Sequence, residues 1–197
     1  QPYLYGMFIE HAGNLVYNSM WAEMLDDRKF YYPVAPQDAP LVHRDALPVQ
    51  RVGQTAGRSR RGGMIRRWIP IGSPEYITMD ASKAYTGDHS PAIKLSATEP
   101  RGFSQAGLAL LSDKTYTGRI LLAGDPAAKV SVSLIWGTGD TGRQTVIISN
   151  LTAAYAKYPL SFKSPVETTD AKLEITATGS GTVYVGAVSL MRSEEHT

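Results

Sequence analysis

From about residue 75 onward, the sequence is a succession of short runs rich in β-branched and aromatic residues, each followed by residues that favour turns. Turn residues recur at intervals of roughly 8 to 12 positions, a spacing typical of a β-sandwich. We therefore predict a mainly β fold for this part of the chain. The runs are 76–79, 92–95, 106–111, 116–122, 130–136, 145–148, 158–162, 173–177 and 183–190.

The run Lys129–Trp136 indicates how such strands are oriented. Val130, Val132 and Leu134 alternate with serines, and alternate residues of a strand point to opposite faces of its sheet. We therefore expect the three apolar side chains in a core and the serines in water.

The composition allows one main core and argues against several kinds of partner. With 197 residues, of which 43% are apolar and 19% charged, the chain can bury one core of good size plus an appendage. A formal net charge of +2 does not indicate a polyanionic partner. The arginines between positions 51 and 67 lack interleaved aromatics, so we interpret them as a solvated loop and expect no nucleic-acid partner. No run approaches the ~20 apolar residues of a membrane helix, so no membrane partner is expected.

Cysteine is absent from the sequence, which excludes disulfides, thiolate zinc sites and a cysteine nucleophile. Asp170 and Glu174 are weak candidates for calcium ligands. We expect no metal ion and no cofactor.

Both ends of the chain look cut. The chain begins at Gln1 and runs at once into an apolar and aromatic run at 3–9, typical of a buried strand. It ends in Arg192–Thr197, which is what a common sequencing adapter, AGATCGGAAGAGCACACG, encodes in this frame. We therefore expect residues 192–197 to be a non-native tail and exclude them from the fold.

Two segments near the start carry a specific family resemblance. The segment Gly6–Tyr17, continued by Trp-Ala-Glu-Met-Leu at 21–25 and Arg-Lys-Phe at 28–30, resembles the opening of the alpha-L-arabinofuranosidases of glycoside hydrolase family 51. In that family the Gly-x-Phe-Ile-Glu-His run forms the first strand of a (β/α)₈ barrel, and the Trp-Ala-Glu-Met-Leu stretch opens the following helix. Apolar spacing over 18–30 also favours a short helix.

The later part of the chain is similar to a β-sandwich that some family members insert after this first unit. The segments that carry this similarity are 89–91, 105–108, 116–119 and 186–191. The resemblance implies a carbohydrate-binding-like (jelly-roll or galactose-binding-like) β-sandwich, preceded by the first strand and helix of an incomplete (β/α)₈ barrel. The expected divisions are a barrel unit at 1–34, a linker at 35–72, the sandwich at 73–191 and the tail at 192–197.

The resemblance also implies a function for a longer parent protein. Such a protein would hydrolyse terminal non-reducing alpha-L-arabinofuranosyl residues of arabinan or arabinoxylan with retention, using two glutamates as nucleophile and acid/base. The Gly-Asn-Glu segment and the later nucleophilic glutamate are not in this sequence, so we expect no catalytic residue here and an inactive fragment. By resemblance Glu10 binds sugar hydroxyls, and Phe8, on the same face of the strand, lines the sugar site. The expected partner is an arabinose-containing oligo- or polysaccharide.

Two alternatives remain open: a non-catalytic carbohydrate-binding module and a purely structural sandwich. Sugar-binding sandwiches present exposed aromatics as stacking platforms, whereas a structural sandwich would bury them all. The aromatic residues concerned are Trp136, Tyr116, Tyr155, Tyr158 and Tyr184.

Overall fold

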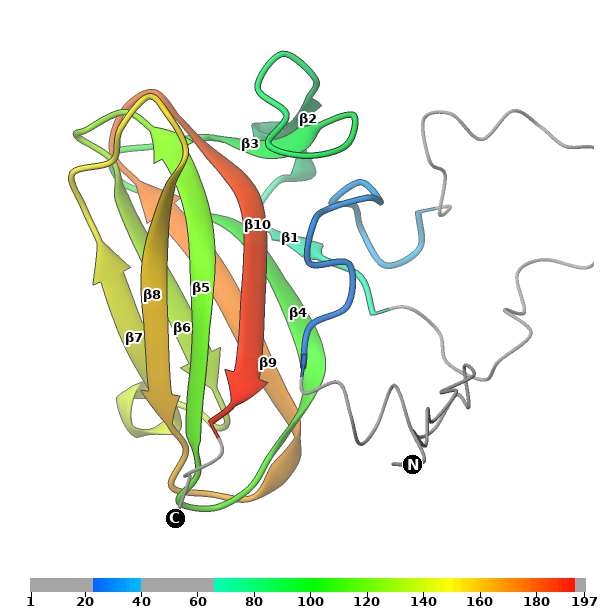
Figure 1. Cartoon of the computed structure of the whole chain (residues 1–197), viewed down its shortest axis with the longest axis vertical. Helices are drawn as coiled ribbons and strands as arrows, with labels where there is room; N and C mark the ends of the chain where they lie inside the picture. Colours follow the sequence, from blue (N-terminus) through cyan, green and yellow to red (C-terminus); the bar gives the residue numbers. More distant parts are fainter. Residues whose placement is uncertain (1–22, 40–65, 194–197) are drawn as a thin grey trace, which may run out of the picture.

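The computed structural model describes residues 23–39 and 66–193, which form a sandwich of two five-stranded sheets (Figure 1). Sheet I has the order β1-β4-β9-β6-β7, and sheet II has the order β2-β3-β10-β5-β8. All the strand pairs within both sheets are antiparallel. Sheet I consists of β1 (Ile69–Ile71), β4 (Arg101–Leu110), β9 (Thr168–Thr178), β6 (Lys129–Ile135) and β7 (Arg143–Ile148). Sheet II consists of β2 (Ile77–Asp80), β3 (Ser90–Lys94), β10 (Thr182–Arg192), β5 (Thr115–Gly124) and β8 (Ala156–Lys163).

The strands form where the sequence alternates. In β6, Val130, Val132 and Leu134 are fully buried between the sheets, as their spacing predicted. The serines on the opposite face of β6 were expected to be in water, but Ser133 is also buried. Its hydroxyl lies 2.8 Å from the hydroxyl of Thr145 on β7. The prediction of a mainly β sandwich is therefore confirmed. Two short 3-10 helices, Pro74–Tyr76 and Asp140–Gly142, are the helical elements of the described residues, and no helix there is long and apolar enough to cross a membrane.

Residues 23–39 pack against the sandwich and contribute to its core. Leu25, Phe30 and Val34 are buried in the same hydrophobic cluster as the strand residues. The Phe30 ring lies 5.5 Å from that of Trp68 and 5.4 Å from that of Phe103 on β4, centroid to centroid, in tilted and edge-on arrangements. Such aromatic contacts add stabilisation beyond the burial of apolar area. In Figure 1 this segment (blue) runs beside β10 and below the β2–β3 loop.

Gln105 on β4 fixes the same segment to sheet I. Its side chain is fully buried, and its amide oxygen accepts a hydrogen bond from the Asp26 backbone N–H at 2.8 Å. Its amide nitrogen donates to the backbone carbonyls of Asp26, at 2.9 Å, and Arg66, at 3.1 Å. The buried amide of Gln105 thus keeps all of its hydrogen bonds only while the backbone at Asp26 and at Arg66 stays in place.

The described residues differ from the sequence-based expectation in two places. Residues 23–30 form turns rather than the expected start of a helix. Asp27 and Phe30 have φ angles of 46° and 57°, and the Asp27 carboxylate accepts hydrogen bonds from the backbone N–H groups of Tyr31 and Tyr32 at 2.7 and 3.0 Å. An aspartate that binds nearby backbone N–H groups competes with helix formation. In addition, β1 lies inside the span that we expected to be a linker, paired with residues 102–104 of β4.

Several expectations fall outside the described residues. One is the predicted first barrel strand, which carries Phe8 and Glu10. Another is the greater part of the expected tail, residues 194–197. Of the tail, Arg192 ends β10 opposite Tyr116, and the backbone N–H of Ser193 donates to the carbonyl of Thr115 at 2.8 Å.

We predict that Phe30→Ala destabilises the protein by about 3 to 5 kcal/mol, because it removes a large buried side chain from the core. Tyr31→Ala is the matched control: Tyr31 is the neighbouring aromatic and is 56% exposed, so its loss should cost only about 0.5 kcal/mol. Urea unfolding of both variants measures the difference. Equal, small effects would contradict the packing of residues 23–39 on the sandwich.

Candidate functional site

The five aromatic residues singled out from the sequence divide into two groups. Tyr116 is buried, and its hydroxyl oxygen accepts a hydrogen bond from the backbone N–H of Leu111 at 2.7 Å. Trp136, Tyr155, Tyr158 and Tyr184 are half-buried. The set is therefore neither wholly buried nor one exposed platform, and Trp136 is the member of it that lines a cleft.

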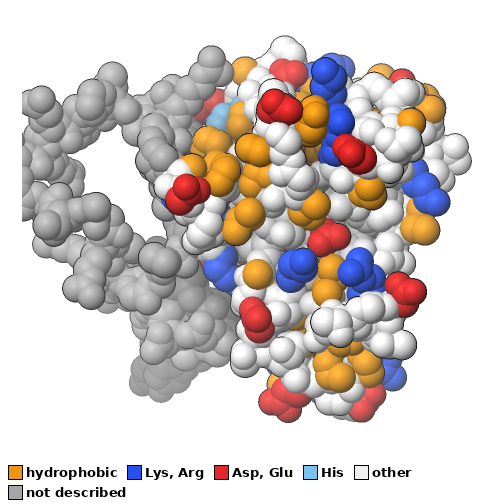
Figure 2. Space-filling view, turned by 180° about the vertical axis from the view of Figure 1, so that it is seen from behind, with side chains coloured by type: hydrophobic (Ala, Val, Ile, Leu, Met, Phe, Trp, Pro, Cys, Tyr) orange, Lys and Arg blue, Asp and Glu red, His pale blue; other side chains and the backbone are white. Residues whose placement is uncertain are grey.

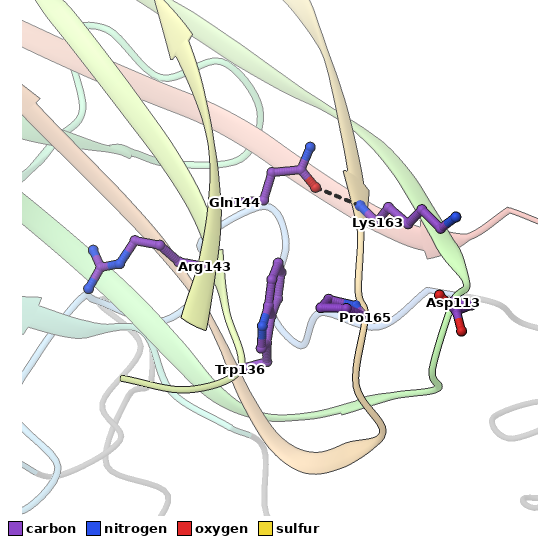
Figure 3. A pocket seen from close by; sticks show the side chains of 6 residues that line it. All are labelled: Asp113, Trp136, Arg143, Gln144, Lys163 and Pro165. Atoms are coloured by element: carbon purple, nitrogen blue, oxygen red, sulfur yellow. Dashed lines mark hydrogen bonds between the residues drawn. The ribbon is translucent and has the colours of Figure 1, made fainter. Parts of the chain in front are cut away.

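The first cleft, which we call the end cleft, lies at the end of the sandwich where β7 begins and β8 ends (Figures 1 and 3). Its volume is about 450 Å³. Both sheets contribute to it, because β7 belongs to sheet I and β8 to sheet II. The lining residues are Asp113, Trp136, Arg143, Gln144, Lys163 and Pro165.

Two backbone hydrogen bonds and one from a backbone N–H to a side chain hold the end cleft together. The side-chain oxygen of Gln144 accepts from the Lys163 backbone N–H at 2.7 Å, which joins the two sheets across the cleft (Figure 3). The backbone N–H of Trp136 donates to the carbonyl of Gly142 at 2.8 Å, so the loop that follows β6 closes on itself. The Asp113 N–H donates to the Ser164 carbonyl at 2.8 Å. The cleft is thus built on fixed backbone rather than on loose loops.

The side chains of the end cleft combine an aromatic surface with both signs of charge. Figure 3 shows Trp136 beside Pro165, while the guanidinium of Arg143 points away from the indole ring. Asp113 supplies carboxylate acceptors, and Lys163 and the amide nitrogen of Gln144 supply donors. None of the charged ends of Asp113, Arg143 and Lys163 forms an ion pair with another described residue. These polar groups line the same cleft as the indole ring, and in Figure 3 the ammonium end of Lys163, like the Arg143 guanidinium, points away from that ring.

The second cleft, which we call the face groove, lies on the outer surface of sheet II and has a volume of about 540 Å³. Its floor is formed by β5 and β10, with Leu121, Ala187 and Ser189 among the floor residues. Loop 81–89 provides one wall through Tyr85 and Thr86, and residues 28 and 29 provide another.

The Tyr85 wall depends on the absence of a side chain at Gly186. The Tyr85 ring stacks edge-on against Tyr155, with centroids 5.1 Å apart. A Cβ at position 186, in the irregular stretch of β10, would lie 2.6 Å from the Cβ of Tyr85 and 2.9 Å from Cε1 of Tyr155. The Tyr155 hydroxyl donates to the Lys83 carbonyl at 2.7 Å and so fixes the loop, and burial raises the pKa of Tyr155 above its ordinary value.

The opposite wall is fixed by Glu23, whose side chain is only 3% exposed. Its carboxylate accepts hydrogen bonds from the Ser189 hydroxyl at 2.6 Å and from the Leu190 backbone N–H at 2.9 Å. It also forms an ion pair with Arg28 at 3.2 Å. The Val188 N–H donates to the Arg28 carbonyl at 3.0 Å. Residues 23–28 thereby lie along the edge of β10 and place Arg28 and Lys29 beside the groove.

Sequence reasoning found only part of these two clefts. Trp136 was recognised as a possible stacking residue, whereas Gln144, Tyr85 and Arg119 were not, because nothing in their local sequence marks them. Glu23 was seen as part of a helix start, and its anchoring role depends on a contact 166 residues away along the chain. Glu10 and Phe8, the predicted sugar contacts, lie outside the described residues.

Asp27, next to the Arg28 wall, has a pKa raised to about 6, mainly because burial disfavours its charged form. The N–H groups of Tyr32 and Tyr31 and the nearby His89 oppose this shift. His89 itself is buried, with Nε2 2.9 Å from the carbonyl of Phe30.

No protein-family model and no curated protein matches the sequence. Solved structures that resemble it include TmCBM61 in complex with beta-1,4-galactotriose, with a TM-score of 0.47 and 16% identity over 64% of this chain and 88% of that one. A family 16 carbohydrate-binding module gives a TM-score of 0.46 and 14% identity over 59% and 85%. The arabinose-bound MgGH51 alpha-L-arabinofuranosidase gives a TM-score of 0.49 and 17% identity over 64% of this chain and 23% of that one. At these values the matches assign neither a family nor a function to this chain.

We predict that Asp27→Asn changes how stability depends on pH. Between about pH 4 and pH 6 the folded protein keeps the Asp27 proton that the unfolded chain has lost, so the wild type loses stability as the pH rises through this window. Asparagine does not titrate, so the variant should gain stability relative to the wild type from pH 4 to pH 7. Urea unfolding at several pH values measures this, and a constant difference between the two proteins would contradict the raised pKa.

Proposed function

We propose that this chain is a non-catalytic carbohydrate-binding module that holds a neutral sugar in the end cleft. The observation that carries the proposal is the half-buried Trp136 in a cleft lined by an amide, a carboxylate and an ammonium group. A sugar ring has apolar C–H faces that pack on an indole ring and a rim of hydroxyls that both donate and accept hydrogen bonds. The end cleft matches both features.

The rigidity and size of the end cleft also support this proposal. The cleft has a volume of about 450 Å³ and is wide open to solvent, so it can admit one face of a sugar ring within a longer polysaccharide. The side chain of Gln144 is held by its bond to the Lys163 N–H, and the backbone of Trp136 by its bond to the Gly142 carbonyl, which limits the conformational freedom lost when a ligand binds. A purely structural sandwich has no need for an accessible indole ring in such a cleft, so we favour the binding module over that alternative.

A second proposal concerns a longer parent protein and rests on the sequence resemblance of residues 6–30. In it, the parent is a retaining alpha-L-arabinofuranosidase that removes terminal arabinofuranosyl residues from arabinan or arabinoxylan. Glu10 would bind hydroxyls of the arabinose, and Phe8 would line the same subsite. The sandwich would then hold the polymer that carries the arabinose branches, and the present chain alone would be inactive.

Trp136→Ala should weaken polysaccharide binding about tenfold or more, since a loss of ~1.4 kcal/mol corresponds to a factor of ten. Affinity gel electrophoresis with arabinan, arabinoxylan, xylan and beta-1,4-galactan measures the binding. Trp136→Phe keeps an aromatic surface and should retain most of the affinity, and Tyr31→Ala, an exposed aromatic outside both clefts, should have no effect. The proposal is wrong if no polysaccharide retards the wild type or if Trp136→Ala binds as tightly.

The parent-enzyme proposal predicts that this chain does not hydrolyse 4-nitrophenyl alpha-L-arabinofuranoside. A longer protein that continues into the barrel should hydrolyse it, and Glu10→Gln in that protein should lower kcat/KM by about 10- to 100-fold, the range for one or two hydrogen bonds to a substrate. His11→Gln, on the opposite face of the same predicted strand, is the control. An unchanged kcat/KM for Glu10→Gln would remove Glu10 from the sugar site.

A further inference from the structure

The residues that line the face groove include more basic than acidic side chains. Arg28, Lys29 and Arg119 line it, and none of the described residues that line it has a carboxylate. Glu23, the acid that pairs with Arg28, is buried and also binds the Ser189 hydroxyl and the Leu190 N–H, so its carboxylate is directed at β10. The rest of the surface is not uniformly basic: on the outer side of sheet I, basic and acidic side chains are interspersed (Figure 2).

Two of these cations are available to a ligand. Lys29 and Arg119 are exposed, and neither side chain forms an ion pair or a hydrogen bond with another described residue. Arg28 is held in place by its ion pair with Glu23. The groove therefore combines one fixed guanidinium with two accessible cations from different elements, since Arg119 comes from β5 and the other two precede Phe30.

The uncharged part of the face groove suits a sugar ring. Tyr85 is 45% exposed and lines the wall, while Leu121 and Ala187 form an apolar part of the floor. The hydroxyl of Thr86 adds a polar group at the same wall. An aromatic wall with a small apolar floor packs against the C–H face of a sugar. A strand of nucleic acid would need a longer basic track with several stacking aromatics, and the described residues that line the groove include one aromatic, Tyr85.

We propose that the face groove binds an anionic sugar residue, namely a uronic acid in a glycan, with its carboxylate on Arg119 and Lys29. A planar carboxylate matches the planar guanidinium of Arg119, which can donate two parallel hydrogen bonds to it. The site is separate from the end cleft, uses different residues and does not depend on Trp136. The chain would accordingly have two glycan contacts, one for neutral and one for acidic sugars.

The decisive comparison is between an acid and its own methyl ester, because esterification removes the charge and keeps the sugar. Isothermal titration calorimetry of the full chain would use tri-galacturonate and glucuronosyl-xylotriose, each beside its methyl ester. We expect at least one acid to bind about tenfold more tightly than its ester, the change for one charge-assisted hydrogen bond. This preference should shrink at high salt.

Matched variants test whether the preference for the acid over its methyl ester arises in the face groove. Lys29→Gln and Arg119→Gln should each reduce it, and the double variant should abolish it, so that the acid binds no more tightly than its ester. Arg143→Gln, which removes a cation from the end cleft, should leave the preference intact. Circular dichroism confirms that the variants are folded.

Three results would overturn the proposal: neither acid binds better than its ester, the preference survives in the folded double variant, or a sulfated trisaccharide outcompetes both uronates. The last result would keep the basic groove but assign it to sulfate instead of carboxylate. Failure of the end cleft is measured separately, by Trp136→Ala on neutral polysaccharides.

Discussion

The carboxylate of Glu23 is the contact on which the arrangement around sheet II depends. It is almost completely withdrawn from water and has three kinds of partner: a hydroxyl and a backbone N–H on β10, and the guanidinium of Arg28. A buried charge is tolerated only when it is paired and hydrogen-bonded in this way. Through it, residues 23–28 are held along β10, Phe30 reaches the core beside Trp68 and Phe103, and Arg28 and Lys29 reach the edge of the face groove.

The two sheets are tied to this segment from both sides. Glu23 binds sheet II, and Gln105, fully buried on β4, binds the backbone of Asp26 and Arg66 from sheet I. If the segment moved away, the buried Gln105 amide would lose its partners, which costs about 1 to 3 kcal/mol for an unsatisfied neutral group, and the Ser189 hydroxyl and the Leu190 N–H would lose the Glu23 carboxylate. The segment that resembles the start of a barrel helix is, in this structure, a part of the sandwich.

The sandwich was predictable because its strands alternate and its turns recur, and both signals are local. β6 illustrates this, with its three apolar residues buried at the expected positions. β1 was missed because it is a three-residue strand that contains Pro70, too short for a period to show. The turn at 23–30 was mistaken for a helix because Trp21, Met24 and Leu25 occur at helical spacing, whereas the Asp27 carboxylate binds the backbone N–H groups of Tyr31 and Tyr32. The clefts were largely unpredictable: Gln144 and Lys163 are 19 residues apart and on different sheets, so only the topology brings them together.

The edge of β10 has a further consequence. On one side β10 pairs with β5 along most of its length, but on the other side β3 pairs only with residues 182–184. Residues 23–28 cover the next part of that edge, where the Val188 N–H and the Leu190 carbonyl are bonded to Arg28 and Met24. Uncovered, these groups would form a template to which a strand of another molecule could add. Residues 23–28 therefore also prevent self-association at this edge. A chain without them would be expected to aggregate through β10.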